Sequence, residues 1–389
     1  MFRASDEYRR SQVAIAALFC CLGFQYATWV SRIPALKTRL DLSEAELGLL
    51  LMVCGAGAAV SFPLVAILTK RLGSRRLAVL SALGLGVVLL ALSVTPDYPV
   101  TLLIVFFDGV AVGCLNVAMN AQAAALEVKY QRTTMARMHA TFSAGSLFAA
   151  LLASGVTSLS SALPAHFGTA TVLLVVLVLA ARAGLLTEDQ KVAEPVEPTG
   201  KKARGLTLPT RVTIWMGLAM AFGTVTEGAM NDWSALYLKD SAGAAAELAP
   251  LGIAVVSVMM VLARLFADGW RTKWGDERVV RVGSALAGVG LAVALLAGGV
   301  VPALLGFACV GLGIAAVTPC VYVAAARQGS DALALVAAMG TTGLLAGPAV
   351  IGFIANGTSL VWGMGAVAVS ALVVSACSTR IRFPVLADA

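Results

Sequence analysis

The sequence has few charged residues and hardly any histidine. Asp, Glu, Lys and Arg make up 13% of its 389 residues, and it contains 2 histidines. An ordinary water-soluble domain carries about 25% charged residues. The 7 cysteines all lie inside apolar stretches, at spacings that suggest neither a metal site nor a disulfide framework. This composition excludes an ordinary soluble globular domain.

Motifs for soluble chemistry are also missing. The phosphate-binding pattern Gly-x-x-x-x-Gly-Lys-Ser/Thr does not occur, so we expect no energy supply from ATP. No catalytic triad and no cluster of metal ligands can be recognised, and the loops are too short to hold a soluble domain. We therefore expect no enzyme activity, no cofactor and no metal.

What fills the chain is a series of twelve apolar stretches, each long enough to cross a bilayer core, which takes about 20 helical residues. Hydrophobic residues make up 59% of the sequence. This pattern predicts an all-α membrane protein with twelve transmembrane helices in two six-helix bundles. The predicted spans are 12–31, 46–68, 77–94, 99–123, 135–157, 164–185, 210–238, 248–269, 279–298, 301–324, 333–355 and 358–378.

The basic residues predict the orientation of these spans. With a cytoplasmic N-terminus, 23 of the 28 Lys and Arg residues lie in cytoplasmic segments and 4 on the opposite side. We therefore expect both termini in the cytoplasm of a bacterial inner membrane, with the first span retained rather than cleaved. The net charge of +7 then reflects basic loops that face anionic lipid, and no nucleic-acid partner is needed.

The chain divides into two related halves. A charged, Pro-containing stretch at 186–209 predicts a cytoplasmic linker between an N-terminal bundle at 1–185 and a C-terminal bundle at 210–389. The halves match at an offset of about 202, which pairs Gln25 with Glu227 and Gly109 with Gly311. Six spans per half preserve the topology, so the repeat is parallel and predicts a cavity between the halves near the midplane.

A basic loop follows the second span of each half. In the first half its frame runs from Ala66 to Arg75, where Arg71, Gly73 and Arg75 match the pattern G-x-L-A-D-R-x-G-R-R and Lys70 replaces the acidic residue. That pattern belongs to the major facilitator superfamily, and the chain resembles this family over its whole length. The resemblance implies the twelve-helix fold of that family and alternating-access transport.

Four further stretches resemble one branch of that family, bacterial permeases of mostly unassigned substrate that are distantly similar to sugar/proton symporters. They are Arg-Ile-Pro at 32–34, Asn-Val-Ala-Met-Asn-Ala-Gln at 116–122, Met-His-Ala-Thr-Phe-Ser at 138–143 and Glu-Gly-Ala-Met-Asn-Asp-Trp-Ser at 227–234.

Polar residues within the spans are the candidate functional residues, because each costs several kcal/mol in lipid unless it faces water or a partner. Glu227, Asn231 and Ser234 share one face of span 7. Glu227 lies near the membrane centre with no evident partner, so we expect it to carry the coupling proton. The alternative is a structural carboxyl bonded to a neighbouring helix.

Span 4 presents a second polar stripe, in which Gly109, Gly113, Asn116 and Asn120 are followed by Glu127. Glycines admit close approach and amides both donate and accept, so the stripe predicts a cavity wall for a polar solute. Helix packing with amides bonded across helices is the alternative. Asp108 lies off this stripe and could be a second proton site or a partner for another polar group.

Span 5 places Arg132, His139, Ser143 and Ser146 on one face. His139 could titrate near neutral pH. A fixed hydrogen bond to span 4 or to Glu127 is an equal alternative. We count Ser143 among the candidate substrate contacts.

Spans 1 and 10 complete the expected wall. Gln25, Trp29 and Arg32 share a face of span 1, where Trp29 fits either the interfacial belt or substrate stacking. Thr318 and Tyr322 lie 202 residues after Asn116 and Asn120 and should form the equivalent wall of the second half.

We expect structural roles for the remaining charged residues. Arg264 and Asp268 are four residues apart on span 8, and this spacing predicts a structural salt bridge between them. Arg32 and Asp232 lie at the outer ends of spans 1 and 7, and we expect them to pair as an outer gate.

The sequence favours a monomeric secondary transporter that moves a small polar solute by alternating access, coupled to protons. Two alternatives stay open. The first is efflux of a drug or secondary metabolite by proton antiport, since Met119, Met230, Trp29 and Phe142 could contact a more apolar solute. The second is a transport-dead membrane sensor with the same fold.

Overall fold

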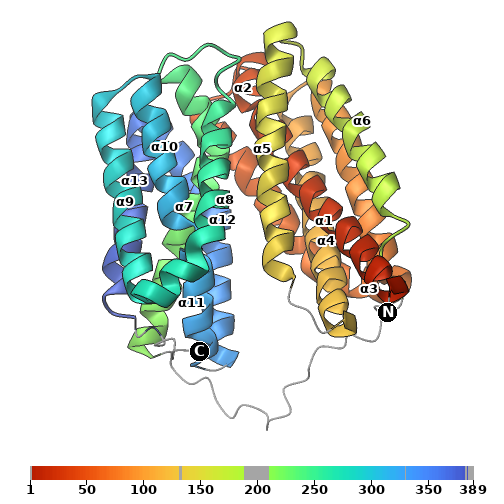
Figure 1. Cartoon of the computed structure of the whole chain (residues 1–389). Helices are drawn as coiled ribbons and strands as arrows, with labels where there is room; N and C mark the ends of the chain where they lie inside the picture. Colours follow the sequence, from red (N-terminus) through yellow and green to blue (C-terminus); the bar gives the residue numbers. More distant parts are fainter. Residues whose placement is uncertain (1, 131–133, 188–209, 329, 382, 384–389) are drawn as a thin grey trace. The chain divides into compact units, whose positions relative to one another are not determined.

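The computed structural model describes residues 2–130, 134–187, 210–328, 330–381 and 383, and this part of the chain is helical without any strand (Figure 1). Its helices are α1 (Phe2–Val30), α2 (Ile33–Leu40), α3 (Glu44–Ser93), α4 (Tyr98–Tyr130), α5 (Met135–Leu159), α6 (Leu163–Ala181), α7 (Arg211–Asp240), α8 (Leu251–Trp274), α9 (Asp276–Ala297), α10 (Val300–Ile314), α11 (Val317–Ala326), α12 (Ser330–Gly357) and α13 (Leu360–Ser378).

These helices supply the twelve predicted spans. Continuous α3 holds spans 2 and 3, which meet at a kink at Gly73. The pair α10 and α11 forms span 10, and α2 is a short extra helix between spans 1 and 2. Among the described residues, ten segments are long and apolar enough to cross a membrane, and α7 and α8 complete the twelve. The predicted fold class is confirmed.

The described chain packs as two compact units. Among the described residues, unit 1 contains 2–29, 53–130, 134–152 and 159–187, and unit 2 contains 30–52, 153–158, 210–328, 330–381 and 383. The compact units thus group 30–52 and 153–158, which precede the linker in sequence, with the C-terminal helices. Most of the predicted linker, 188–209, lies outside the described residues.

Glycines let the helices of unit 1 approach closely. A Cβ atom on Gly109 of α4 would lie 1.8 Å from the carbonyl oxygen of Cys54 in α3, and one on Gly57 would lie 2.1 Å from the carbonyl oxygen of Phe106. Helices α1 and α5 also approach closely at a glycine: a Cβ on Gly23 would lie 2.0 Å from the Phe142 carbonyl oxygen. Small residues at such crossings are the usual means of packing helices in lipid.

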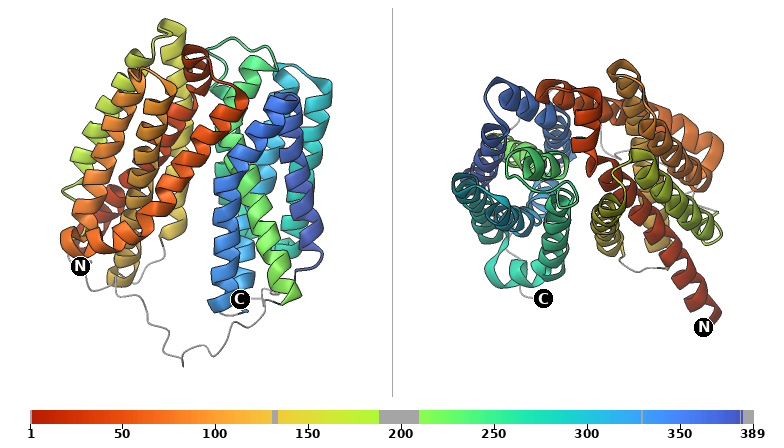
Figure 2. Two further views of the ribbon diagram at one scale, coloured as in Figure 1. Left: turned by 180° about the vertical axis from the view of Figure 1, so that it is seen from behind. Right: turned by 90° about the horizontal axis from the view of Figure 1, so that it is seen from above.

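Helix α7 forms the centre of unit 2, where it contacts α8, α10, α11, α12 and α13. The right-hand view of Figure 2 shows α7 in green among the teal and blue helices. The contact with α12 is close at Gly343, where a Cβ would lie 2.3 Å from the carbonyl oxygen of Ala221. The candidate residues Glu227 and Asn231 therefore lie on the most central helix of this unit.

The backbone repeats between the halves at the basic loops. Gly73 has φ 75° and ψ 159°, and Gly275, 202 residues later, has φ 77° and ψ 153°. Residues with a Cβ rarely adopt this positive φ, so glycine is required for the turn in both halves. The equal conformations support the internal repeat inferred from sequence.

Candidate functional site

Two asparagines of α4 form an accessible pair of amides. Asn120 Nδ2 donates to Asn116 Oδ1 at 2.9 Å and to the Asn116 carbonyl oxygen at 2.8 Å. Asn116 is exposed and Asn120 partly exposed. Within the described chain neither amide bonds to another helix, so the cross-helix alternative does not account for them. Each keeps donors and acceptors available to a polar solute.

The two glycines of the same stripe have a different role. A Cβ on Gly113 would lie 2.0 Å from Ser61 Oγ in α3, and Gly109 meets the Cys54 backbone as described above. These glycines allow α3 to pack closely against α4. For them the helix-packing alternative is correct, and the open part of the stripe is limited to the asparagines.

Asp108 lies next to the stripe and is fully buried. Gln25 Nε2 of α1 donates to Asp108 Oδ1 at 2.8 Å, and Cys54 Sγ of α3 lies 3.7 Å from Oδ2. Of the two roles left open for Asp108, the structure supports a partner for another polar group. Gln25, predicted to contact substrate, is itself fully buried, and its Nε2 is engaged with this carboxyl.

Glu227 is not a lone carboxyl. Arg264 Nη2 of α8 donates to Glu227 Oε1 at 3.1 Å, and both side chains are 30% exposed. The i,i+4 spacing on α8 suggested Asp268 as the partner of Arg264. The side chain of Asp268 lies outside the described residues. The described partner of Arg264 is Glu227, which belongs to another helix, α7. Sequence spacing reveals neighbours on one helix but not those across two helices.

The polar face of α7 is also partly occupied by its own helix. Asn231 Nδ2 donates to the carbonyl oxygen of Glu227 at 3.1 Å, and the side chain is partly exposed. Ser234, one turn further on, is fully buried.

Span 10 is broken in the region of the predicted second-half wall. Helix α10 ends at Ile314 and α11 begins at Val317, with a turn at 315–316. Pro319 in the first turn of α11 has no backbone N–H to donate, which favours the break. Thr318 and Tyr322 follow it and are partly exposed. Ala315 and Ala316 in the turn keep right-handed helical backbone angles, so α10 and α11 continue one span across a short turn.

Other candidates are packed within the protein. Trp29 is fully buried, so it belongs neither to an interfacial belt nor to an exposed stacking surface in this structure. Ser143 is buried at 5% exposure. His139 is exposed and contacts Phe19 edge-on, with ring centroids 5.1 Å apart. Glu127 accepts a hydrogen bond from the Thr134 backbone N–H ahead of α5.

At the other end of the helices, Arg32 donates a hydrogen bond to the hydroxyl of Thr157, and both belong to unit 2. Asp232 is buried at 4% exposure. The expected Arg32–Asp232 pair stays a prediction.

Arg132 lies outside the described residues. Arg75 donates to the carbonyl oxygen of Arg182 at 2.9 Å, and Arg71 is exposed beside it.

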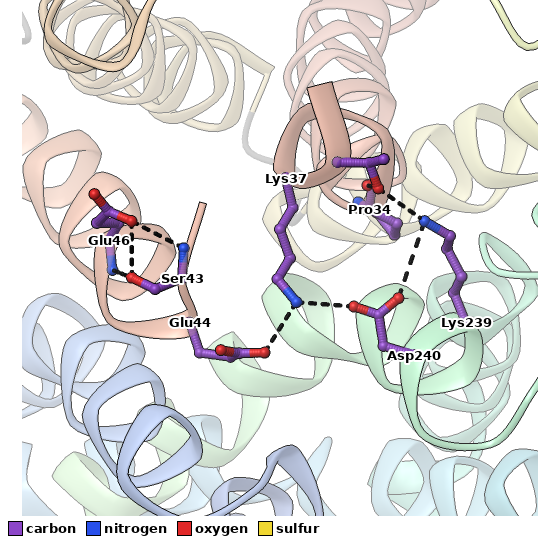
Figure 3. Close-up of polar contacts among 8 residues, drawn as sticks. Pro34, Lys37, Ser43, Glu44, Glu46, Lys239 and Asp240 are labelled. Carbon is purple, nitrogen blue, oxygen red and sulfur yellow. Dashed lines mark hydrogen bonds and ion pairs between the residues drawn. The ribbon is translucent and has the colours of Figure 1, made fainter. Parts of the chain in front are cut away.

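Sequence reasoning missed an ionic network that joins α2 to the start of α3 and the end of α7 (Figure 3). Lys37 Nζ of α2 lies 2.9 Å from Glu44 Oε1 in the first turn of α3 and 3.0 Å from Asp240 Oδ2 at the end of α7. Lys239 Nζ donates to Thr38 Oγ1 at 3.1 Å. Nothing in the local spacing connects residues 37 and 240, so only tertiary packing reveals the network.

The fold and these intramembrane polar groups define a membrane transporter. The sequence model of the Major Facilitator Superfamily matches residues 13–331, and the chain belongs to this family. It is a transporter and not an enzyme.

Relatives of similar length support the assignment. The chain is 33% identical over 383 residues to an uncharacterized MFS-type transporter of Yersinia pestis, covering 95% of each chain. It is 31% identical over 352 residues to the uncharacterized transporter y4wD of Sinorhizobium fredii, covering 89% of this chain and 91% of the other.

Solved structures agree on the fold. The nucleoside transporter NupG superposes with a TM-score of 0.73 at 17% identity, covering 96% of this chain and 98% of that one. A bacterial homolog of the human lysosomal transporter Spinster, in an inward-facing and occupied conformation, superposes with a TM-score of 0.71 at 14% identity, covering 96% of both chains.

Proposed function

We propose that the chain moves a small polar solute across a bacterial cytoplasmic membrane by alternating access, coupled to protons. The observation that carries the substrate class is the Asn116–Asn120 pair, which is accessible and bonded only within α4 among the described residues. Apolar solutes leave such amides unsatisfied, whereas hydroxyl, amine or carbonyl groups of a polar solute satisfy them.

In this proposal unit 2 contributes the charged part of the mechanism. The Glu227 carboxylate is neutralised by Arg264 at 3.1 Å, and both groups remain accessible. Protonation of Glu227 would release the guanidinium, so the pair has two charge states. A proton taken up on one side of the membrane and released on the other supplies the coupling. Thr318 and Tyr322, beside the helix break, are the polar groups that α11 would offer to the solute.

The orientation proposed here follows the distribution of Lys and Arg, with both termini in the cytoplasm. Arg32 and Asp232 then lie toward the outer surface, where their pairing would close the outer side.

The test begins with thermal-shift screening of the purified protein against polar metabolites and apolar drugs, followed by counterflow of the hits in proteoliposomes. Asn116→Ala or Asn120→Ala should weaken binding of a polar hit by about 1–3 kcal/mol, or about 5- to 150-fold, because one polar group of the solute loses its partner. Asn356→Ala, at an exposed amide near the end of α12, is the control and should leave affinity unchanged.

Three results would contradict the proposal in different ways. Unchanged affinity in both α4 variants would remove these amides from the binding site. Hits confined to apolar drugs would favour efflux. Binding without counterflow would identify a sensor.

A further inference from the structure

A pocket rich in arginine lies in unit 1, at the turn between the two halves of α3. The pocket has a volume of about 650 Å³. It is lined by Arg71, Leu72, Gly73, Arg75, Arg76, Val79, Leu80, Arg182 and Thr187. Four of these nine residues are arginines, and no carboxylate is among them. Within the described chain, no ion pair involves any of the four.

The pocket is held in place by a buried amide. Gln122 of α4 is fully buried, and its Nε2 donates to Ser74 Oγ at 2.7 Å and to the Leu186 carbonyl oxygen at 3.0 Å. Its Oε1 accepts from the Leu186 backbone N–H at 2.8 Å. One side chain therefore ties the turn before Arg75 to the segment that follows Arg182. Arg75 adds its own hydrogen bond to the Arg182 carbonyl oxygen at 2.9 Å.

The second half of the chain provides an internal comparison at the same turn. Asp276, at 1% exposure, accepts from Arg271 Nε at 2.8 Å and from Nη2 at 3.2 Å. Glu277 pairs with Arg281. Two basic residues near the turn in the second half, Arg271 and Arg281, thus have carboxylate partners from the turn itself.

In the first half those two carboxylates are replaced. At the offset of 202, Ser74 stands where the second half has Asp276, and Arg75 stands where it has Glu277. The backbone turn is the same, but the first-half turn carries more positive charge and has no acid at these two positions. Guanidinium groups gathered in one pocket repel each other, and a bound anion relieves this repulsion.

We propose that this arginine pocket, named for Arg71, Arg75, Arg76 and Arg182, binds a phosphate-bearing anion. Arginine presents paired N–H donors that match phosphate oxygens, and four such groups can neutralise a doubly charged headgroup. Basic pockets between membrane helices on the cytoplasmic side are suited to anionic lipid headgroups.

An apolar surface adjoins the pocket and favours a lipid as the source of the phosphate. Leu80 lines the pocket and is 56% exposed, and Val87 and Leu90 on the same helix are 67% and 45% exposed. Leu80 and Val87 are seven residues apart, which is about two helical turns, so they share a face. Acyl chains can lie along this face while the headgroup occupies the arginines.

Native mass spectrometry of the purified full chain, supplied with cardiolipin, phosphatidylglycerol or phosphatidylcholine, tests the proposal. We expect the two anionic lipids to be retained and phosphatidylcholine to be lost. Arg76→Gln and Arg71→Gln should each lower retention about tenfold, because each removes charge-assisted hydrogen bonds to the phosphate. Arg278→Gln and Lys273→Gln, at the equivalent exposed positions of the second half, are the matched controls and should retain the wild-type level.

A second arm distinguishes the source of the phosphate. Delipidated protein is titrated with inorganic phosphate and glycerol 3-phosphate by isothermal calorimetry. Heat that disappears in Arg76→Gln but not in Arg278→Gln assigns the pocket to a free anion, whereas lipid retention without such heat assigns it to a headgroup. Equal retention of all three lipids with no phosphate heat would overturn the proposal. Equal loss in Arg76→Gln and Arg278→Gln would overturn it as well, because it would indicate general attraction to basic loops.

Discussion

At the scale of single residues, the structure changes the setting of the main candidate. Glu227 was expected as a lone carboxyl, and it has a guanidinium partner 3.1 Å away. In the proposed mechanism, a solute that displaces the Arg264 guanidinium would leave the Glu227 carboxyl without this partner.

The proposed coupling can be tested first with a single variant of Glu227. Glu227→Gln imitates the protonated carboxyl, so it should abolish accumulation driven by a pH gradient and retain exchange of solute. Proteoliposomes with an imposed pH gradient measure accumulation, and counterflow without a gradient measures exchange. Retained accumulation in Glu227→Gln would remove the carboxyl from the coupling mechanism.

The double variant Glu227→Gln with Arg264→Gln distinguishes a role of Glu227 in proton coupling from a purely structural role of the ion pair. If the pair only stabilises the fold, removing both charges should restore accumulation, because neither member of this pair is then left without the other. If Glu227 carries the proton, the double variant should still exchange solute and still fail to accumulate it. Recovered accumulation in the double variant would contradict the proton-carrier proposal.

At the scale of helices, small residues decide how unit 1 packs. The glycines of α4 could have lined a cavity or admitted another helix, and sequence alone left both open. The structure places the Cys54 carbonyl oxygen 1.8 Å from where a Cβ on Gly109 would lie. This contact makes the glycine a requirement of the α3–α4 crossing.

Gly109→Ala should therefore lower the stability of the protein by about 1–3 kcal/mol, because backbone on both sides must shift. Gly84→Ala in α3 is the control, since a Cβ there meets no atom within 4 Å. It should be neutral or stabilising by up to about 1 kcal/mol through helix propensity. Thermal unfolding in detergent micelles measures both. A melting temperature for Gly109→Ala at or above that of Gly84→Ala would mean that the two helices are not tightly packed there.

The helices themselves were largely predictable, because a membrane leaves few solutions for long apolar runs. The twelve spans and the repeat followed from hydrophobic length and from matching turns such as Gly73 and Gly275. The break between α10 and α11 was not predicted, although Pro319 was visible. A proline can kink, break or merely begin a helix, and the tertiary surroundings decide among these outcomes.

The candidate site was less predictable than the helices. Residues of one helix face, such as Asn116 and Asn120, could be grouped from spacing alone. Partners from different helices could not, which is why Arg264 beside Glu227 and Gln25 beside Asp108 were missed. Periodicity locates a side chain around its own axis, whereas a hydrogen bond between helices depends on how far and at what angle the axes cross.

At the scale of the whole molecule, the duplicated sequence and the compact units do not divide at the same residues. Residues 30–52 and 153–158 precede the linker but pack in unit 2. Lys37 joins the first of these segments to α7 through Asp240. Ser154 joins the second to the Glu247 carbonyl oxygen. A rearrangement of the two sequence halves must break such contacts.

The Lys37 network in Figure 3 is suited to reversible breaking. The side chains of Lys37, Glu44 and Asp240 are 19%, 28% and 30% exposed, so the charges are partly solvated. Pairs of this kind contribute up to about 1 kcal/mol. That amount biases two nearly balanced states without locking either.

Lys37→Gln should therefore loosen α2 from the end of α7. Hydrogen–deuterium exchange followed by mass spectrometry should show amide exchange about fivefold faster in Ile33–Leu40, the change expected for about 1 kcal/mol. Lys129→Gln breaks a comparable 2.9 Å pair with Glu7 in unit 1 and is the control. It should leave exchange in α2 unchanged. Equal exchange in Lys37→Gln and wild type would mean that apolar packing, through buried residues such as Leu36, holds α2 in place and the ionic network adds nothing measurable.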